Sequence, residues 1–203
     1  LCDRRQRQMC IRDSPKKLTE MSAILSDLGV EVVSEADLGG KIEVEETGET
    51  FAENSLLKAR AVMEATKLPA IADDSGLCVD ALNGGPGVYS ARFGGEGLDD
   101  TGRYRLLLQM MHGQADRRAH FHTTITCAFP NGDVLQDDGE VEGTIAFAPM
   151  GENGFGYDPV FFVPDKRKTF AQLTAEEKAE ISHRGKALRA FKETLKNYLA
   201  EHQ

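Results

Sequence analysis

Two adjacent carboxylates, Asp73 and Asp74, follow directly on the short apolar run Pro69-Ala70-Ile71-Ala72. That run predicts a buried strand, and charges beside a buried strand must be solvated, paired or bound to a metal ion. Ser75-Gly76 is typical of a turn, so we expect the carboxylates at a strand end, where open α/β sheets build their sites. The alternative is a solvated turn, and this segment alone does not choose between the two.

A second acidic segment comes earlier, where Glu45 and Glu46 precede Thr47-Gly48. The helix expected next carries Asn54 and Lys58, which are four residues apart and therefore share one helix face. An amide and an ammonium near a helix start suit phosphate oxygens. Taken by itself, Lys58 is better explained as a solvated surface lysine, so the functional interpretation depends on the other motifs.

Two glycine-rich segments could shape binding loops. Gly84-Gly85-Pro86-Gly87 lets the backbone approach another group closely, although a plain tight turn, with Arg92 as a salt-bridge partner, explains it too. In Gly154-Phe155-Gly156-Tyr157-Asp158 an aromatic ring between glycines offers an open face. Stacking of a base on such a ring is worth about 1–3 kcal/mol, and the neighbouring Asp158 can accept a hydrogen bond from a ring N–H.

His183 and Arg184 stand at the expected start of the last helix. Donors placed there, together with the positive end of the helix dipole, would face an acceptor. The plainer alternative is a helix cap or a surface residue.

A frame of helices and strands must bring these residues together. Caps and apolar stripes predict helices from Pro15 to Leu28, from Thr50 to Lys67, from Asp99 or Asp100 to Met111, after Thr174, and from Ser182 through Leu199. Alternation and short apolar runs predict strands at 30–33, 42–44, 70–72, 117–129, 134–146 and 160–163, with a hairpin at Asn131-Gly132. Helices alternate with strands around an inserted hairpin, so we expect a mixed-sheet α/β domain.

Composition sets limits on function. The chain has 203 residues, a net charge of −9 and four cysteines. So acidic a chain is a poor candidate for sequence-independent nucleic-acid binding, and no apolar run approaches the roughly 18 residues of a membrane span. No secretory signal is visible, and no Cys-x-x-Cys pair suggests zinc. We expect free thiols and a cytoplasmic protein.

Four motifs together resemble the inosine triphosphate pyrophosphatase family, in its bacterial form. They are Ala72-Asp-Asp-Ser-Gly-Leu77, Gly84-Gly-Pro-Gly-Val-Tyr-Ser-Ala-Arg92, Gly154-Phe-Gly-Tyr-Asp-Pro-Val-Phe-Phe162 and Ser182-His-Arg-Gly185. The resemblance implies hydrolysis of inosine, deoxyinosine and xanthosine triphosphates to the monophosphate and pyrophosphate, with Mg²⁺ as cofactor. It also implies a homodimer and an elongated α/β fold, with a mixed sheet flanked by helices and two lobes around a central cleft.

The resemblance also implies roles for single residues. Glu46 and Asp74 match metal-binding positions, with Asp73 as a further possible ligand, and Asp74 also matches the proton acceptor. Oxygen ligands suit Mg²⁺, and Asn54 and Lys58 would contact the triphosphate. The remaining substrate-contacting positions are Lys17, Ser75, Phe155, Gly156, Tyr157, Asp158, Lys178, His183 and Arg184.

Base selectivity has a donor–acceptor logic. Hypoxanthine, the base of inosine, presents an O6 acceptor and an N1–H donor, and adenine presents the reverse pair. Arg184 or His183 donating to O6, with Asp158 accepting from N1–H, would fit inosine and leave polar groups unpaired with adenine. A mismatch of that kind can discriminate by as much as ~10⁴-fold.

The first 14 residues depart from the family pattern. Members begin with a strand that ends in Ser/Thr-Gly-Asn-x-x-Lys, but Arg12, Asp13 and Ser14 stand at the Thr-Gly-Asn positions and only Lys17 matches. The apolar run of the first strand is also missing. We therefore interpret 1–14 as a non-native, artefactual or disordered tail and 15–203 as the single family domain.

Three other functions stay open at this stage. A damaged phosphate motif predicts a nucleotide-binding protein with weak or no catalysis. A related pyrophosphatase could instead act on modified pyrimidine or other damaged triphosphates. The basic residues of the first 17 could form a nucleic-acid arm, which the net charge of −9 disfavours.

Overall fold

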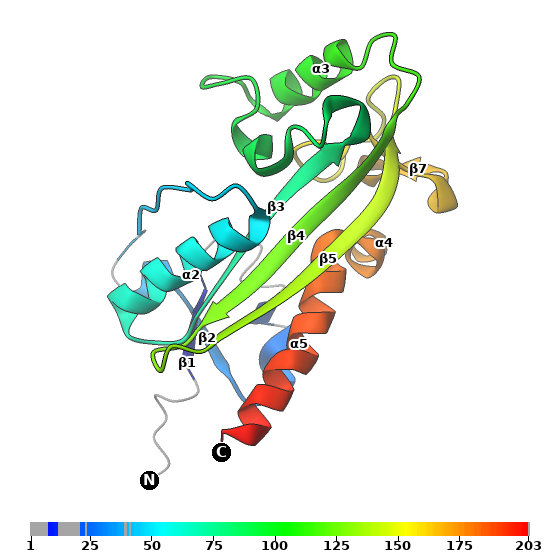
Figure 1. The fold of residues 1–203 in the computed structure, drawn as a ribbon. Coiled ribbons are helices and arrows are strands. Elements are labelled where there is room, and N and C mark those ends of the chain that lie inside the picture. The colour runs from blue at the N-terminus through cyan, green and yellow to red at the C-terminus, as the bar shows by residue number, and fades with distance from the viewer. Residues whose placement is uncertain (1–7, 12–20, 23, 39, 41, 203) are drawn as a thin grey trace. The chain divides into compact units, whose positions relative to one another are not determined.

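The computed structural model describes residues 8–11, 21–22, 24–38, 40 and 42–202, and it divides into two compact units. The first unit comprises Leu1–Asp74, Thr123–Gly139 and Ala187–Gln203, and the second comprises Ser75–His122 and Glu140–Lys186. One mixed sheet has the strand order β2-β1-β3-β4-β5-β6-β7 and is flanked by helices (Figure 1). The α/β class with a mixed sheet is confirmed.

The first unit contains a strand that the sequence did not predict. Strand β1 (Gln8–Ile11) lies between β2 (Glu31–Ser34) and β3 (Ala70–Val79) and is parallel to both. Met9, Cys10 and Ile11 are at most 1% exposed. A strand thus forms within the first 14 residues although a longer apolar run is missing: three buried side chains suffice because the strand is short and paired on both edges.

Helix α2 (Phe51–Thr66) begins and ends where its sequence signals place it. Thr50 and Glu53 form a reciprocal capping box, and Lys67 ends the helix in the left-handed region. The buried face of α2 carries Ala59 and Val62, which pack against small residues of the neighbouring strands. Small side chains on both sides bring this helix close to the sheet.

Two expectations about strands in the first unit were wrong. Residues 42–48 are not a strand, because the backbone N–H of Ile42 lies 3.4 Å from Glu35 Oε2 instead of pairing with a neighbouring strand. Strand β3 does not end at Ala72 but continues to Val79. Asp73 and Asp74 therefore lie within a strand, which is possible because a side-chain cation reaches Asp74 there.

The hairpin predicted at Asn131-Gly132 is present between β4 (Arg118–Ala128) and β5 (Val134–Ile145). The Gly132 N–H donates to Phe129 O at 3.0 Å, and Gly132 has a φ of 97°. Helix α5 (His183–Glu201) packs the predicted stripe into the core of the first unit. The fully buried members of that stripe are Leu188, Phe191 and Leu195.

The second unit has its own apolar core, in which Phe121, Phe161 and Phe170 contact one another as a group of rings. Around it lie α3 (Asp100–Met110), β6 (Phe161–Val163), β7 (Lys168–Thr169) and α4 (Ala175–Ile181). Short 3₁₀ turns complete the chain: Ser26–Leu28, Glu35–Leu38, Asp80–Leu82, Gly87–Arg92, Pro164–Lys166 and Phe170–Gln172. Strand β7 had no sequence signal because it has only two residues.

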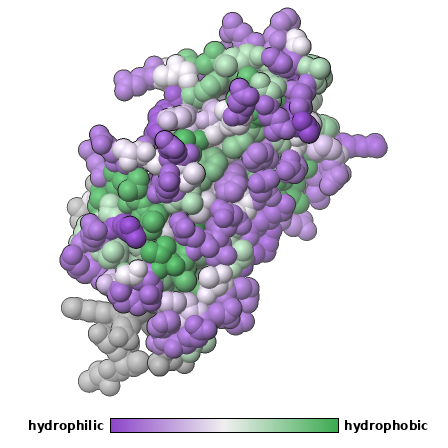
Figure 2. All heavy atoms as spheres, viewed as in Figure 1, coloured by the Kyte–Doolittle hydropathy of each residue, from purple (hydrophilic) through white to green (hydrophobic). Residues whose placement is uncertain are grey.

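The surface is mostly hydrophilic on the face drawn in Figure 2, and apolar side chains show through over α2. Leu57 of that helix is 37% exposed. Within the part of the chain that is described, every helix is too short or too polar to cross a bilayer.

Candidate active site

Two acidic side chains of the first unit share one lysine. The Lys58 ammonium lies 2.6 Å from Asp74 Oδ1 and 3.2 Å from Glu46 Oε1. Lys58 comes from the middle of α2, Asp74 from β3, and Glu46 from the irregular segment before α2. The structure thus brings Asp74 together with Glu46 and Lys58, which the sequence placed in a different segment.

Asp74 is buried, and its two oxygen atoms differ. Oδ1 accepts from Lys58, whereas Oδ2 is a buried atom with no hydrogen-bond partner among the described residues. Burial raises the pKa of the Asp74 carboxyl, and the nearby ammonium opposes that shift. The strand backbone is held from β4, because Thr123 Oγ1 donates to the Asp74 carbonyl at 3.1 Å.

Asn54 lies on the face of α2 that carries Lys58, but it is completely buried. Its Oδ1 accepts from the Gly48 N–H at 2.8 Å and its Nδ2 donates to the Gly48 carbonyl at 3.3 Å. A Cβ on Gly48 would lie 2.7 Å from Asn54 Oδ1, so glycine is needed for this close approach. The amide therefore fixes the segment that carries Glu46, and its contact with the Asp74 carboxyl also lowers the pKa of that group.

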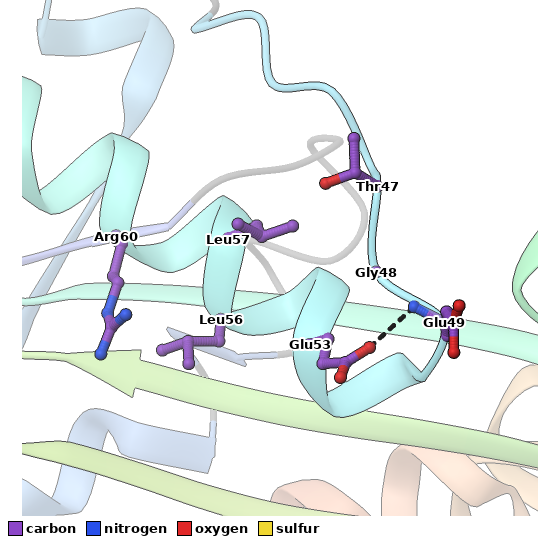
Figure 3. Close-up of a pocket in the computed structure, with 7 residues that line it drawn as sticks. All are labelled: Thr47, Gly48, Glu49, Glu53, Leu56, Leu57 and Arg60. Atoms are coloured by element: carbon purple, nitrogen blue, oxygen red, sulfur yellow. Dashed lines mark hydrogen bonds between the residues drawn. The ribbon is translucent and has the colours of Figure 1, made fainter.

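The same segment is anchored a second time to the first turn of α2. The Glu49 N–H donates to Glu53 Oε2 at 2.7 Å, as the dashed line in Figure 3 marks. This anchored segment forms one wall of a surface pocket of about 370 Å³. The pocket is lined by Thr47, Gly48, Glu49, Glu53, Leu56, Leu57 and Arg60, and none of the clustered carboxylates lines it.

Helix α2 is also tied to the hairpin by buried hydroxyls. Ser55 Oγ and Thr126 Oγ1 lie 2.6 Å apart, and Gln136 Nε2 donates to Thr126 Oγ1 at 2.9 Å. These contacts place the helix along β4 and β5 within the first unit. They fix the position along β3 at which the Lys58 side chain contacts the strand.

The donor set suits a hard divalent cation. Glu46 and Asp74 supply carboxylate oxygens, and Oδ2 of Asp74 is a buried acceptor with no hydrogen-bond partner in the described chain. Asp73, which is 2% exposed, precedes Asp74 in β3, where consecutive side chains point to opposite faces of the sheet. Oxygen-only ligands of this kind are those that Mg²⁺ prefers. The residues present therefore fit the ion that the resemblance implies.

A second group of predicted site residues lies in the second unit. Lys178 pairs with Asp158 Oδ2 at 2.5 Å and lies 4.7 Å from the centroid of the Phe155 ring. The Phe155 N–H also donates to Asp158 Oδ2, at 2.9 Å. Asp158 is 3% exposed and the Phe155 ring 57% exposed. An open aromatic face thus stands beside a buried carboxylate and its counter-ion.

Two residues that sequence reasoning did not place in the site hold this aromatic segment. Ser90 accepts through its carbonyl from the Tyr157 hydroxyl at 2.8 Å, and Asp100 Oδ2 accepts from the Gly156 N–H at 2.8 Å. Tyr157 is buried as a result. Asp100 was considered only as a helix cap, and Asp99 fills that position, accepting from the Gly102 N–H. Only the folded chain reveals these partners.

The other predicted residues have different surroundings. His183 is 8% exposed and stacks on Phe121, with ring centroids 4.8 Å apart. Arg184 is partly buried beside it at the start of α5. Ser75 is the first residue of the second unit and is partly buried in β3. Lys17 and the positions 12–14 lie outside the described residues, so their predicted roles are not addressed.

Comparisons with known proteins give a consistent result. A sequence profile described as the Ham1 family matches residues 11–194. The dITP/XTP pyrophosphatase of Desulforamulus reducens is 50% identical over 189 residues, covering 92% of this chain and 94% of that protein. The Escherichia coli dITP/XTP pyrophosphatase is 48% identical over 185 residues, with 89% and 93% covered.

Solved structures give the same result for the fold. The Staphylococcus aureus Ham1 protein has a TM-score of 0.89 and 41% identity, covering 94% of this chain and 99% of that one. A dITP/XTP pyrophosphatase from Mycobacterium abscessus has a TM-score of 0.79 and 43% identity, with 91% and 97% covered. At these identities the likeness extends beyond the fold to the sequence that builds it.

Proposed function

Because the chain belongs to the Ham1 family, we propose that it hydrolyses noncanonical purine nucleoside triphosphates, those of inosine, deoxyinosine and xanthosine, to monophosphate and pyrophosphate. The curated relatives are dITP/XTP pyrophosphatases at about half identity over almost the whole chain. The chain is thus a hydrolase that acts on acid anhydrides. Its role would be to remove damaged purines from the nucleotide pool.

The observation that carries this proposal is the Glu46–Lys58–Asp74 cluster. A buried carboxylate with one unengaged oxygen, in the described part of the chain, is what a reaction with water requires. Burial that raises the pKa of Asp74 makes its carboxylate a better base than an exposed one. Asp74 would take a proton from the attacking water.

Glu46 and Asp74 would hold Mg²⁺, whereas Asp73, the further ligand that the resemblance suggests, points to the other face of β3. When bound, the ion supplies a more acidic water and positive charge for the triphosphate. Lys58, from α2, would bring further positive charge to the phosphate oxygens. Lys17, which lies outside the described residues, would do the same. Asn54 would hold the Glu46 segment through Gly48 and contact the Asp74 carboxyl.

The second unit would recognise the base. The exposed face of Phe155 suits stacking, and Asp158 would accept from N1–H through Oδ1, because Oδ2 already accepts from Lys178 and the Phe155 N–H. His183 and Arg184 would donate toward O6. Ser75, Gly156 and Tyr157 complete the predicted contacts, the last two held by Asp100 and Ser90.

Assembly and location are part of the proposal. We expect a homodimer, no nucleic-acid partner and a cytoplasmic location. Free thiols at Cys10, Cys78 and Cys127 support a reducing compartment. The family resemblance supports the dimer, and light scattering of the purified chain would measure it directly.

The test is pyrophosphate release from ITP, dITP, XTP, GTP and ATP with Mg²⁺ present. We expect kcat/KM for the first three to exceed that for GTP and ATP by on the order of 100-fold or more, because wrong bases leave polar groups unpaired. Comparable values for all five, or a preference for modified pyrimidine triphosphates, would contradict the assignment.

A further inference from the structure

Lys58 occupies the centre of the carboxylate cluster. Its ammonium contacts oxygens of both Asp74 and Glu46, at 2.6 and 3.2 Å. The side chain is only 11% exposed, as against 10% for Asp74 and 27% for Glu46. An ion pair so withdrawn from water differs from a surface salt bridge, because each charge depends on its partner for solvation.

The position of Lys58 is fixed by its helix. Helix α2 is capped at Thr50, closed at Lys67 and bonded to β4 through Ser55. The ammonium is therefore delivered to the carboxylates by a rigid element. In the absence of another cation it neutralises one of two negative charges that would otherwise repel each other in a buried place.

The roles proposed for Asp74 conflict with this arrangement. Asp74 is proposed both to bind the divalent cation and to accept a proton from water. These two roles need both of its oxygen atoms. One of them, Oδ1, is held by Lys58. If one oxygen holds the cation and the other accepts the proton, Oδ1 must take one of these roles while Lys58 still contacts it. Where Oδ1 holds the divalent cation, the ammonium and the cation repel each other.

We propose that Lys58 is a resident cation that stands in for the metal ion and leaves Asp74 when a divalent ion binds. This inference rests on the proposed function. The exchange keeps the cluster charge-compensated in both states, so the buried carboxylates are never left unpaired. The displaced ammonium becomes available for the triphosphate, whose oxygens arrive at the same place.

The exchange predicts opposite effects of one substitution on binding and on turnover. Lys58→Met removes the competing charge and keeps the length of the side chain. We expect Mn²⁺, measured as free ion by electron paramagnetic resonance, to bind on the order of tenfold more tightly to the variant. Turnover of ITP should fall, because the ammonium is lost. A purely structural lysine would not make metal binding tighter.

Lys192→Met is the matched control. Lys192 also pairs with an aspartate of the first unit, since its ammonium lies 2.7 Å from Asp27 Oδ2, but this pair is on the surface. It should leave Mn²⁺ affinity unchanged. A second readout uses the wild-type chain: mass spectrometry should find Lys58 acetylated faster by acetic anhydride with Mn²⁺ than without it. Slower or equal labelling would contradict the exchange even if Lys58→Met failed to fold.

The outcomes separate the inference from the proposed function. If wild-type chain binds Mn²⁺, Asp74→Asn abolishes that binding, and Lys58→Met binds equally or more weakly, the metal site stands and the exchange is wrong. If wild-type chain binds no Mn²⁺ at Asp74, the proposed metal site fails, and the exchange fails with it. Tighter Mn²⁺ binding by Lys58→Met, with unchanged binding by Lys192→Met, supports the exchange.

Discussion

The chemistry of a carboxylate depends on what its two oxygen atoms contact, and the first unit offers a direct comparison. Asp27 is an exposed carboxylate paired with Lys192, and hydrogen bonding to that lysine lowers its pKa. Asp74 is also paired with a lysine, but burial outweighs the pairing and raises its pKa. The lysine lowers the carboxyl pKa in both cases, and burial reverses the net shift only for Asp74. A raised pKa fits the role of proton acceptor that the family resemblance implies for Asp74.

Asn54→Ala tests how Glu46 is positioned. The change removes both hydrogen bonds to the partly buried backbone of Gly48, each worth about 1 kcal/mol of folding free energy. The loosened Glu46 segment should lower kcat for ITP on the order of tenfold or more. Steady-state kinetics and thermal unfolding measure the two effects.

Asn131→Ala is the control for that experiment. Asn131 bonds Asp133 and Tyr198 at the surface of the hairpin. Its loss should change stability slightly and leave kcat as it is. Full turnover by Asn54→Ala would show that the Gly48 contact does not position Glu46.

Asp137 gives a pH prediction at the same scale. Burial raises its pKa above the usual 3.8, Thr194 donates to Oδ1 at 3.1 Å, and Oδ2 is buried without a partner in the described chain. A raised folded-state pKa means that stability is fully present below the unfolded pKa and is lost as pH rises through the folded value. The ionised group therefore destabilises the neutral-pH protein.

Asp137→Asn keeps an acceptor for Thr194 and removes the charge. We expect its melting temperature to exceed that of the wild type at pH 7.5 and the difference to shrink as pH falls toward 4.5. Differential scanning calorimetry at several pH values measures this. A difference that grows toward acid pH would contradict the assignment of the shift to Asp137.

At the level of elements, sequence patterns predicted what is local and missed what depends on neighbours. The capping boxes at Thr50 and Thr174 set the starts of α2 and α4, because their signals lie within four residues. Strand β1 was missed because its three buried side chains stand between polar segments, and its stability comes from pairing with β2 and β3. The alternation at 42–44 imitated a strand without a partner to pair with.

The site follows the same rule. Residue types and spacing, with the family resemblance, were enough to propose Glu46, Asp74, Phe155 and Asp158 as site residues. They could not give the direction of the Asn54 amide or the partners Ser90 and Asp100, which lie 67 and 56 residues from Tyr157 and Gly156. Nor could they show that β3 runs on past Asp74.

Deletion tests the strand β1. Removing 1–7 should leave stability and turnover near those of the full chain, because β1 begins at Gln8. Removing 1–11 also removes Met9 and Ile11, each worth about 2–5 kcal/mol when buried. Together they approach the whole stability of an ordinary domain, about 5–15 kcal/mol.

We therefore expect the shorter deletion to fold and the longer one to be largely unfolded, as circular dichroism would show. A stable, active chain lacking 1–11 would mean that β1 is dispensable. It would also restore the interpretation of 1–14 as a segment outside the domain.

In the molecule as a whole, the residues proposed for chemistry and those proposed for recognition belong to different units. The carboxylate cluster lies in the first unit and the aromatic group in the second, and the chain passes from one to the other at Asp74 and Ser75. Substitutions in the two groups should therefore have separable effects on kinetics.

Phe155→Ala tests that separation. Loss of a stacking ring costs about 1–3 kcal/mol per base, so kcat/KM for ITP should fall roughly 10- to 100-fold, mainly through KM. Phe147→Ala is the matched control, because Phe147 is 86% exposed in the same unit and stacks on Arg117. Equal losses from both variants would argue against base stacking on Phe155.

The most direct measurement of the central claim is pyrophosphate release from ITP by Asp74→Asn beside Asp27→Asn, with Mg²⁺ present. Both changes remove a carboxylate that pairs with a lysine in the first unit. We predict that Asp74→Asn loses at least about 100-fold in kcat, the usual contribution of a general base, and that Asp27→Asn stays within about twofold of wild type, as a surface ion pair should. Wild-type turnover by Asp74→Asn would contradict the claim that this cluster carries the reaction.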